Sequence, residues 1–338
     1  MAKPKVFVTR IIPEGGLKVI REYCDVDLWV EDLPPSYEVL LEHSQACDGV
    51  VSLLTDRIDA HFMDSCPQLR VVSNFAVGFD NIDIPSATNR GILVGHTPGV
   101  LTETTADFAF ALLMSLARRI PEGIEYVRND QWQTWGPMLL MGQDVHHSVL
   151  GLVGLGRIGV EMAKRARGFD MRVLYTDMYR REDLEASMGL EYASFDDVLR
   201  SADFISVHTP LTAETRHLLS KDAFSKMKKT AIVINTARGP IIDTEALTEA
   251  LQNGVIGGAA LDVIDPEPLR ADHPLVNMPN CIVVPHIASA SETTRTHMAE
   301  IAAYNLLAGL RGEKLPNGLN PEAVGTLRQT LPRTFEVL

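Results

Sequence analysis

An apolar run that leads directly into three spaced glycines constrains this chain more than any other feature. A strand expected over Val149–Val153 is followed by the pattern G-x-G-x-x-G at Gly154, Gly156 and Gly159, and then by a helix expected over Arg157–Gly168. The glycines permit a tight turn and a close approach of a pyrophosphate, and the helix N-terminus faces the phosphates. The sequence therefore predicts a dinucleotide-binding α/β domain.

An acidic residue after the next strand bears on the choice of cofactor. Asp177 follows the strand expected over Met171–Thr176, at the distance from the glycines where a carboxylate accepts hydrogen bonds from the adenosine ribose. Its charge would repel a 2′-phosphate, which favours NAD over NADP. Arg180 and Arg181 follow in the same loop and could grip that phosphate. We predict NAD and leave NADP open.

The alternation of strand and helix continues along the chain. Short runs of mostly Val, Ile and Leu stand at 6–8, 50–54, 71–72, 92–94, 149–153, 173–175, 204–207, 232–234, 259–261 and 282–284. Continuous apolar runs are typical of parallel strands covered on both faces. Because 338 residues exceed one domain of about 150, we predict an α/β protein with two doubly wound parallel-sheet domains.

The segment 102–120 predicts a helix with apolar residues on more than one side. One stripe contains Ala109, Leu112, Leu113, Leu116 and Ala117, and another contains Ala106, Phe110 and Met114. Such a helix is either a core helix beneath both domains or one that packs partly against a second subunit. A last helix over 291–310 is expected to return to the first domain, and the tail from Gly312 onward to extend along the surface.

Composition excludes several classes of function. A net charge of −13 repels nucleic acid and anionic membrane surfaces. The four cysteines lie far apart without a Cys-x-x-Cys pair, so we expect free buried thiols, no disulfide and no metal site. No run approaches the roughly 18 apolar residues that span a membrane, and no leader segment is evident. We expect a cytoplasmic protein.

Three later strands end in side chains suited to carbonyl chemistry. Arg238 follows the strand over 232–234, Glu267 lies in the loop after Asp262, and His286 follows the last strand. Transfer of a hydride to a ketone carbon requires a proton donor at the oxygen and a cation that holds the substrate. A carboxylate beside a histidine favours its charged form. Isolated histidines such as His208 and His217 are interpreted as structural.

Taken together, these motifs resemble the D-isomer-specific 2-hydroxyacid dehydrogenase family over about residues 5–312. The resemblance rests on GLVGLGRIG, the strand ending in NTARGP, LDVIDPEP and PHIASAS, in that order. It implies a flavodoxin-like substrate domain and a Rossmann domain. It also implies that Arg238 binds the substrate carboxylate and ketone, that His286 is the acid/base, and that Glu267 orients and charges His286.

The resemblance extends to cofactor contacts and domain boundaries. It implies that Asp262 helps to hold the nicotinamide amide and that the backbone at Thr236 and Ala237 lies beside the cofactor. The implied substrate domain comprises 1–100 and 288–338, and the dinucleotide-binding domain comprises 101–287. The expected cofactor-binding residues are Gly154, Gly156, Arg157, Ile158, Gly159, Asp177, Pro210, Thr215, Thr236, Ala237, Asp262 and Ala288.

Within the family the chain looks most like the glyoxylate/hydroxypyruvate reductase branch, on NFAVGFDNID at 74–83, LTETTAD at 101–107 and NLLAGLRG at 305–312. The likeness implies that the amides of Val77 and Gly78 receive the substrate carboxylate, that Leu53 or Leu54 shapes the pocket, and that Trp135 reaches in from a partner subunit. A homodimer is therefore expected. The lysine of phosphite dehydrogenases is absent at Val77, which disfavours phosphite oxidation.

The expected activity is reduction of a small 2-oxo acid, glyoxylate or hydroxypyruvate, to the D-2-hydroxy acid. Two alternatives stay open. The substrate could be a bulkier aliphatic or aromatic 2-oxo acid, since the fold does not determine the substrate. The chain could instead be a dinucleotide-sensing co-regulator, from which only turnover would distinguish an enzyme.

Overall fold

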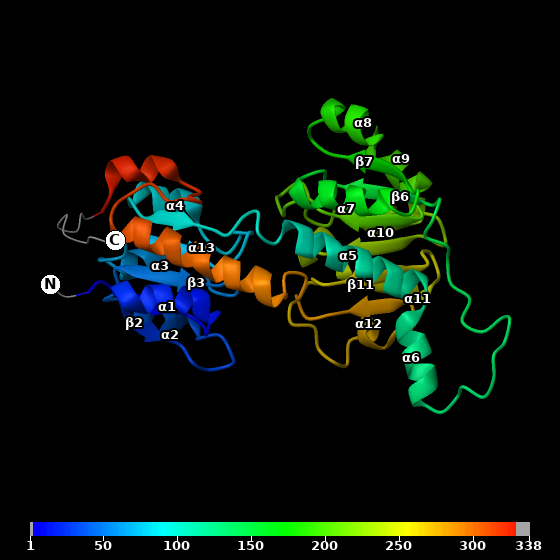
Figure 1. The fold of residues 1–338 in the computed structure, drawn as a ribbon, viewed down its shortest axis with the longest axis horizontal. Coiled ribbons are helices and arrows are strands. Elements are labelled where there is room, and N and C mark those ends of the chain that lie inside the picture. The colour runs from blue at the N-terminus through cyan, green and yellow to red at the C-terminus, as the bar shows by residue number, and fades with distance from the viewer. Residues whose placement is uncertain (1–2, 329–338) are drawn as a thin grey trace. The chain divides into compact units, whose positions relative to one another are not determined.

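A computed structural model describes residues 3–328 of the chain, which form two compact units. The first contains the described residues up to Leu101 and those from Ala290 onward, and the second is Thr102–Ser289. Each unit is a parallel sheet with helices on both faces (Figure 1). The predicted fold class is confirmed.

The first unit has a five-stranded sheet in the order β2-β1-β3-β4-β5, the flavodoxin-like order. Its strands are β1 (Lys5–Val8), β2 (Asp25–Leu28), β3 (Gly49–Ser52), β4 (Val71–Asn74) and β5 (Leu93–Gly95). Its helices are α1 (Glu14–Tyr23), α2 (Tyr37–Ser44), α3 (Ala60–Ser65), α4 (Ile84–Asn89) and α13 (Glu292–Leu310).

Successive strand residues of the first unit face opposite cores. Val6 and Val8 join the cluster beneath α1 and α13, whereas Phe7 joins the cluster beneath α2 and α3. Both faces are apolar, which explains why these strands read as continuous apolar runs. α13 begins at the Ser291 cap, whose hydroxyl accepts a hydrogen bond from the Thr294 amide at 3.1 Å.

The second unit has a seven-stranded sheet in the order β12-β11-β10-β9-β6-β7-β8. Its strands are β6 (Val149–Val153), β7 (Arg172–Thr176), β8 (Glu191–Tyr192), β9 (Phe204–Val207), β10 (Ile232–Asn235), β11 (Gly258–Leu261) and β12 (Cys281–Val283). Its helices are α5 (Thr102–Ala117), α6 (Ile120–Arg128), α7 (Arg157–Arg167), α8 (Glu182–Met188), α9 (Phe195–Ser201), α10 (Lys221–Lys226), α11 (Thr244–Gln252) and α12 (Pro274–Asn277). The first strand, β6, lies at the point where the strand order reverses, as in Rossmann folds.

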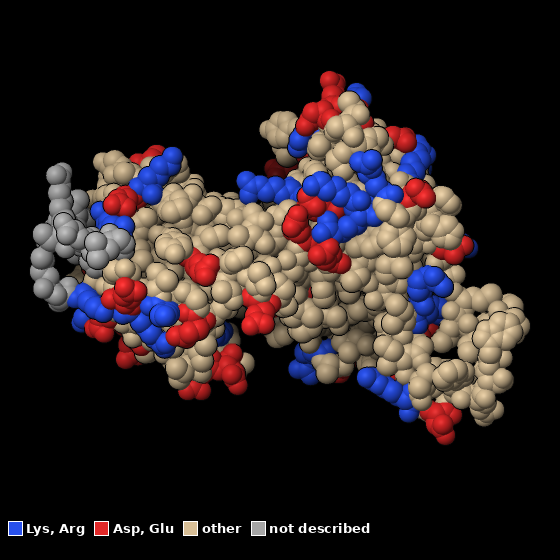
Figure 2. Space-filling model, viewed as in Figure 1, with Lys and Arg blue, Asp and Glu red and all other residues tan. Residues whose placement is uncertain are grey.

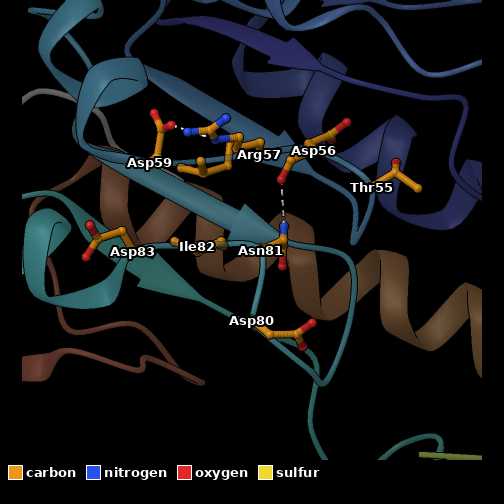
Figure 3. Close-up of a pocket in the computed structure, with 9 residues that line it drawn as sticks. Thr55, Asp56, Arg57, Asp59, Asp80, Asn81, Ile82 and Asp83 are labelled. Atoms are coloured by element: carbon orange, nitrogen blue, oxygen red, sulfur yellow. Dashed lines mark hydrogen bonds and ion pairs between the residues drawn. The ribbon is translucent and has the colours of Figure 1, made fainter. Parts of the chain in front are cut away.

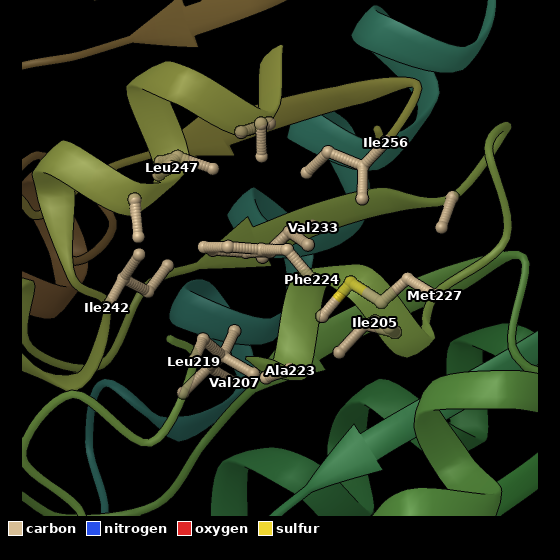
Figure 4. Close-up of a cluster of buried hydrophobic side chains, with 14 of the residues drawn as sticks. Ile205, Val207, Leu219, Ala223, Phe224, Met227, Val233, Ile242, Leu247 and Ile256 are labelled. Atoms are coloured by element: carbon tan, nitrogen blue, oxygen red, sulfur yellow. The ribbon is translucent and has the colours of Figure 1, made fainter. Parts of the chain in front are cut away.

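The second sheet also separates two cores. Phe224 of α10 lies against Ile205 and Val233 in one of them (Figure 4). The other core contains the intervening strand residues, among them Phe204 and Ile232, packed beneath α5 and α7. The strands are therefore fixed from both sides, and the polar side chains that follow them gather at the carboxyl edge of the sheet.

The helix expected over 102–120 ends earlier than its apolar pattern indicated. α5 stops at Ala117, and Arg119 adopts a left-handed conformation with φ of 54° before α6 begins at Ile120. Pro121 occupies the first turn of α6, where a helix does not need its N–H as a donor. One helix therefore ends here and a second one begins. The expectation of burial on more than one side is confirmed, since α5 packs against α7 and three strands of its own unit.

The segment after Gly312 packs more deeply than a surface extension. Asn320 is buried, accepts a hydrogen bond from the Val94 amide at 2.8 Å and donates to the Ile92 carbonyl at 2.9 Å. A 3-10 helix over Pro321–Thr326 follows. The part of the predicted tail beyond residue 328 lies outside the described residues.

Acidic and basic side chains lie interspersed on the face shown in Figure 2. Within residues 3–328 no helix has the length and apolarity needed to cross a bilayer. Three of the four cysteines are buried and Cys281 is half-buried, all four as free thiols. Burial raises the pKa of the Cys24 thiol to about 12.

Candidate active site

The glycine loop has the conformation that its sequence predicts. Gly154 has φ of 97°, and a Cβ there would stand 2.8 Å from the carbonyl carbon of His208, so this position requires glycine. Gly156 caps α7, and a Cβ built on it would meet nothing within 4 Å. The space beside the N-terminus of α7, where Arg157 and Ile158 open the helix, therefore fits the pyrophosphate of a dinucleotide.

Asp177 lies directly against the glycine loop. Its Oδ2 accepts a hydrogen bond from the Leu155 amide at 2.6 Å, and its Oδ1 accepts one from the Tyr179 amide at 3.2 Å. The carboxylate is thus held at the end of β7, beside the loop, where the hydroxyls of a cofactor ribose would donate hydrogen bonds to it.

Both arginines after Asp177 pair with carboxylates of α8. Arg180 makes a bidentate contact with Glu185 at 2.9 and 2.7 Å, and Arg181 makes one with Asp183 at 2.9 and 2.8 Å. The Tyr175 hydroxyl also donates to Glu185 at 2.7 Å. The Arg180 guanidinium, followed by this hydroxyl, lowers the pKa of Glu185 to about 2. The guanidinium groups of Arg180 and Arg181 are therefore both paired with carboxylates of α8.

Three polar residues stand side by side at the carboxyl edge of the sheet. His208, Thr236 and Asp262 each follow one of the paired residues Val207, Asn235 and Leu261. Burial lowers the pKa of His208 to about 4, and its Nε2 lies 2.8 Å from the Ser206 hydroxyl. Neither His208 Nδ1 nor Thr236 Oγ1 has a hydrogen-bond partner among the described residues, although both are buried. Polar capacity thus remains at the edge where a dinucleotide would lie.

Arg238 is placed by a buried asparagine at the end of β10. Asn235 donates to the Arg238 carbonyl at 2.9 Å and accepts from the Ala237 amide at 3.0 Å, which folds the chain into a tight turn. Gly239 then packs against the backbone of Ile264, where a Cβ would meet the carbonyl carbon at 2.1 Å. The turn that carries Arg238 and the loop after β11 therefore lie in contact.

His286 and Glu267 are brought together although they are well separated in sequence. Nδ1 of His286 lies 2.8 Å from Oε1 of Glu267. Since a carboxylate only accepts, Nδ1 carries the proton, and Nε2 is the nitrogen that can exchange a proton with a ligand. His286 has φ of 53°, a left-handed conformation that is uncommon outside glycine.

Asp262 holds the backbone on which His286 stands. Its two carboxylate oxygens accept hydrogen bonds from the amides of Ile287 at 2.6 Å and Ala288 at 2.9 Å, and its carbonyl accepts one from the His286 amide at 3.0 Å. Burial raises the pKa of Asp262, and these backbone hydrogen bonds act against that rise. The carboxylate therefore fixes the unusual backbone conformation of His286.

Two further expected cofactor residues form one turn after β9. The Thr215 hydroxyl donates to the Pro210 carbonyl at 2.7 Å and accepts from the Thr212 amide at 2.7 Å. The expected residues Leu53, Val77 and Gly78 belong to the first unit, in the turns that follow β3 and β4. The strand expected over 50–54 ends at Ser52, which leaves Leu53 and Leu54 in its turn.

Similar proteins place this site in a family. A model of the D-isomer specific 2-hydroxyacid dehydrogenase NAD-binding domain matches residues 110–288. The chain belongs to the D-isomer specific 2-hydroxyacid dehydrogenase family. It is accordingly a dehydrogenase that uses a nicotinamide dinucleotide.

Relatives match over nearly their whole length. The dehydrogenase is 52% identical to a glyoxylate reductase of Korarchaeum cryptofilum over 95% of this chain and 97% of that protein. Among solved structures, the TT0316 protein of Thermus thermophilus has a TM-score of 0.89 and 46% identity, with 93% of this chain and 99% of that one covered. A glyoxylate/hydroxypyruvate reductase of Sinorhizobium meliloti, in complex with NADP and malonate, has a TM-score of 0.86 and 30% identity, with 98% and 100% covered.

After α6 the chain forms an extended arm over residues 129–148, which leaves the body of the second unit (Figure 1) and includes Trp135 in its sequence. The Trp135 side chain is 78% exposed, and other large apolar side chains of the arm and α6 are also exposed: Ile124, Val127, Trp132, Met138 and Met141. Among the described residues, no contact joins Trp135 to His286 of the same chain. Contiguous apolar side chains with such exposure are typical of surfaces that contact another protein.

Sequence reasoning missed residues that shape the site without offering chemistry of their own. Asn235, Tyr175 and Glu185 were not singled out, because each acts through a hydrogen bond that depends on tertiary structure. A polar residue at the end of a buried strand, as Asn235 is, was the available signal. No cluster of His, Cys, Asp and Glu suited to a metal ion occurs within residues 3–328.

Proposed function

We propose that this dehydrogenase reduces glyoxylate and hydroxypyruvate to the corresponding D-2-hydroxy acids. The observation that carries the proposal is the 2.8 Å pair of His286 and Glu267, held at the same sheet edge as the glycine loop. Proteins named glyoxylate reductase are 52% and 50% identical to this chain over 95% and 96% of its length, which supports the substrate class. The first unit would serve as the substrate domain and the second as the dinucleotide-binding domain.

The proposed roles follow from charge and hydrogen-bonding capacity. Arg238 would bind the substrate carboxylate and the ketone oxygen, because a guanidinium offers a planar pair of donors. The bound reduced nicotinamide supplies the hydride. Nε2 of His286 would donate a proton to the ketone oxygen, and Glu267 would orient the imidazole through its contact with Nδ1.

The remaining substrate contacts would come from the first unit and from a partner subunit. The amides of Val77 and Gly78 would receive the substrate carboxylate, and Leu53 would line the side of the pocket that limits substrate size. Trp135 would enter the site of the other protomer in a homodimer, which its exposure of 78% supports. A small pocket closed by apolar side chains would select two- and three-carbon 2-oxo acids.

NAD is the proposed cofactor. Asp177 would face the adenosine ribose beside the glycine loop, and Arg180 and Arg181 are engaged by carboxylates of α8. A 2′-phosphate would meet one negative charge and no unpaired guanidinium from these two arginines. The hydroxyl groups of Thr215 and Thr236 and the backbone at Ala288 would complete the cofactor site.

A substrate panel tests the proposal. Glyoxylate, hydroxypyruvate, pyruvate and phenylpyruvate are assayed with NADH and with NADPH by nicotinamide absorbance. We expect the highest kcat/KM with glyoxylate or hydroxypyruvate and NADH. Preference for phenylpyruvate would favour a bulkier physiological substrate. Binding of NADH without turnover of any 2-oxo acid would favour a dinucleotide-sensing co-regulator.

A further inference from the structure

The turn after β4 in the first unit has three consecutive carbonyls fixed by donors from other segments. The Ala76 carbonyl accepts from the Thr97 amide at 2.9 Å. The Val77 carbonyl accepts from Nδ1 of His96 at 2.9 Å, and the Gly78 carbonyl accepts from Nδ2 of Asn74 at 3.0 Å. Two of these three donors are side chains, and neither has a role in the proposed chemistry.

Fixing a carbonyl also aims the N–H group of the same peptide. The peptide unit is planar and trans, so the N–H of the next residue points away from the carbonyl oxygen. The hydrogen bonds to Ala76, Val77 and Gly78 therefore aim the N–H groups of Val77, Gly78 and Phe79. No described residue accepts a hydrogen bond from the N–H of Val77 or Gly78. A donor on the carbonyl also polarises the peptide and strengthens its N–H as a donor.

Asn74 has a fixed orientation because it is fully buried among defined partners. The Ser52 hydroxyl donates to its Oδ1 at 3.0 Å, while its Nδ2 donates to the Gly78 carbonyl and, at 3.2 Å, to Oδ1 of Asn81. Since a carbonyl oxygen only accepts, Nδ2 must face Gly78. Neither amide atom of Asn74 can be exchanged for the other without loss of a hydrogen bond.

The same network reaches the turn that carries Leu53. Nδ2 of Asn81 donates to the carbonyls of Leu53 at 3.0 Å and Asp56 at 2.9 Å, and the latter bond is visible in Figure 3. Oδ2 of Asp56 accepts from the Leu53 amide at 2.7 Å. Both turns that would contact the substrate are therefore positioned by one connected set of polar side chains.

We propose that Asn74 and His96 are positioning residues for the substrate carboxylate. By holding the Val77 carbonyl, His96 aims and polarises the Gly78 N–H. By holding the Gly78 carbonyl, Asn74 fixes the peptide that follows Gly78 and so the direction of the turn. The proposal rests on the proposed function, in which the amides of Val77 and Gly78 receive a carboxylate. It adds two side chains that touch neither substrate nor cofactor and yet set substrate affinity.

Asn74→Asp tests the role of the donor with almost no change of shape. The variant places an acceptor opposite the Gly78 carbonyl, so the turn should lose its fixed direction. We expect KM for glyoxylate to rise about 10-fold or more, with kcat changed less than threefold and KM for NADH unchanged. Asn320→Asp is the matched control, because Asn320 is equally buried in the same unit and also bonds backbone groups on both sides. The control should lower thermal stability without raising KM.

An uncharged substrate separates positioning from general loosening. Methyl glyoxylate lacks the carboxylate, so Asn74→Asp should change its kcat/KM much less than that of glyoxylate. Equal losses with acid and ester would overturn the proposal. So would an equal rise of KM in Asn320→Asp, which would show that damage to the unit suffices.

Variants of His96 test the proposal independently of Asn74. Asparagine can place an amide N–H close to the position of Nδ1, whereas leucine cannot donate. We expect His96→Asn to keep KM for glyoxylate within about threefold of wild type and His96→Leu to raise it about 10-fold. Equal KM values in the two variants would contradict a role for the donated hydrogen bond.

Binding of oxamate distinguishes failure of this inference from failure of the proposed function. Oxamate carries a carboxylate and is measured by calorimetry with the NADH-bound protein. A protein that turns over no 2-oxo acid but binds oxamate, and binds it about 10-fold more weakly after Asn74→Asp, would refute the activity and sustain the inference. Oxamate affinity that is unchanged in Asn74→Asp, or absent in wild type, would overturn the inference.

Discussion

His286 combines a proton-transfer side chain with a left-handed backbone, which residues other than glycine adopt mainly where the surroundings enforce it. Its φ of 53° is held by hydrogen bonds from its own amide and the two that follow to Asp262. These hydrogen bonds fix the backbone that carries the imidazole, which lies against Glu267. A proton donor placed in this way loses little freedom when a substrate binds.

Removal of either charged partner of the substrate should therefore abolish most activity. We expect His286→Ala and Arg238→Ala each to lower kcat/KM for glyoxylate by about 100-fold or more, the low end for loss of acid catalysis or of an electrostatic clamp. His217→Ala is the control, because His217 has the same φ of 53° and lies outside the proposed site. Near wild-type turnover in a variant would remove that residue from its proposed role.

The buried imidazole of His208 makes the free energy of unfolding depend on pH. Burial lowers its pKa to about 4, against 6.5 in the unfolded chain. Between these values the unfolded chain binds the proton more readily, so stability is complete above pH 6.5 and falls as the pH is lowered toward 4. The loss attributable to this group is at most about 3 kcal/mol. Urea denaturation at pH 7 and pH 5 should give a smaller difference for His208→Gln, which keeps a donor near Ser206 but does not titrate. An unchanged difference would contradict this assignment.

At the scale of elements, sequence patterns predicted the strands that are buried on both faces. They missed the edge strands and the end of α5, which depends on local backbone conformation. The buried strands were predicted because both faces are apolar, as β9 (Phe204–Val207) illustrates. β2 (Asp25–Leu28) and β8 (Glu191–Tyr192) are short edge strands with polar residues, and no apolar run marks them. The end of α5 was missed because its break depends on Arg119, whose conformation no composition reveals.

The candidate site divides in the same way. The sequence singled out Arg238, Glu267 and His286, because a charged group after an apolar strand has few structural explanations, and the structure places His286 beside Glu267. Asn74 and Asn235 were not singled out, because an asparagine at a strand end is typical of an ordinary turn. Their hydrogen bonds join segments that only the folded chain brings together.

The loop between β7 and α8 predicts how cofactor preference can be changed. Replacement of Asp177 with Ser removes the charge that would repel a 2′-phosphate. We expect Asp177→Ser to raise kcat/KM for NADPH relative to NADH about 10-fold or more, since a hydrogen bond to a charged group contributes about 1.5–3 kcal/mol. Steady-state kinetics with both cofactors measure the ratio. An unchanged ratio would place the ribose elsewhere.

Release of Arg180 should add to this effect. Glu185→Gln weakens the ion pair that holds the guanidinium, so Arg180 becomes available to a phosphate. The double variant Asp177→Ser/Glu185→Gln should prefer NADPH more strongly than Asp177→Ser alone. Glu191→Gln is the control, since Glu191 forms a similar exposed pair with Arg172 of β7. If Glu191→Gln increased the preference for NADPH by the same factor, the effect would come from the change in net charge and not from release of Arg180.

At the scale of the whole molecule, the exposed apolar arm allows the proposed homodimer to be tested. Trp132, Trp135 and Met138 are 62%, 78% and 72% exposed. A homodimer built on this arm would bury these side chains and place Trp135 in the partner's pocket. Light scattering should then give twice the mass of the 37.2 kDa chain. A monomer with full activity would exclude both the dimer and the role of Trp135 in a partner.

Mixed dimers test whether Trp135 acts across subunits. In a homodimer of Trp135→Ala every pocket lacks the indole, so KM for glyoxylate should rise, and a homodimer of His286→Ala should be nearly inactive. A heterodimer of the two, isolated with two affinity tags, contains one pocket with an intact His286 from the first chain and an intact Trp135 from the second. That pocket should show wild-type KM with about half the wild-type kcat per dimer. If the heterodimer instead retains the raised KM of Trp135→Ala, the tryptophan acts within its own chain, because exchange of partners has then restored nothing.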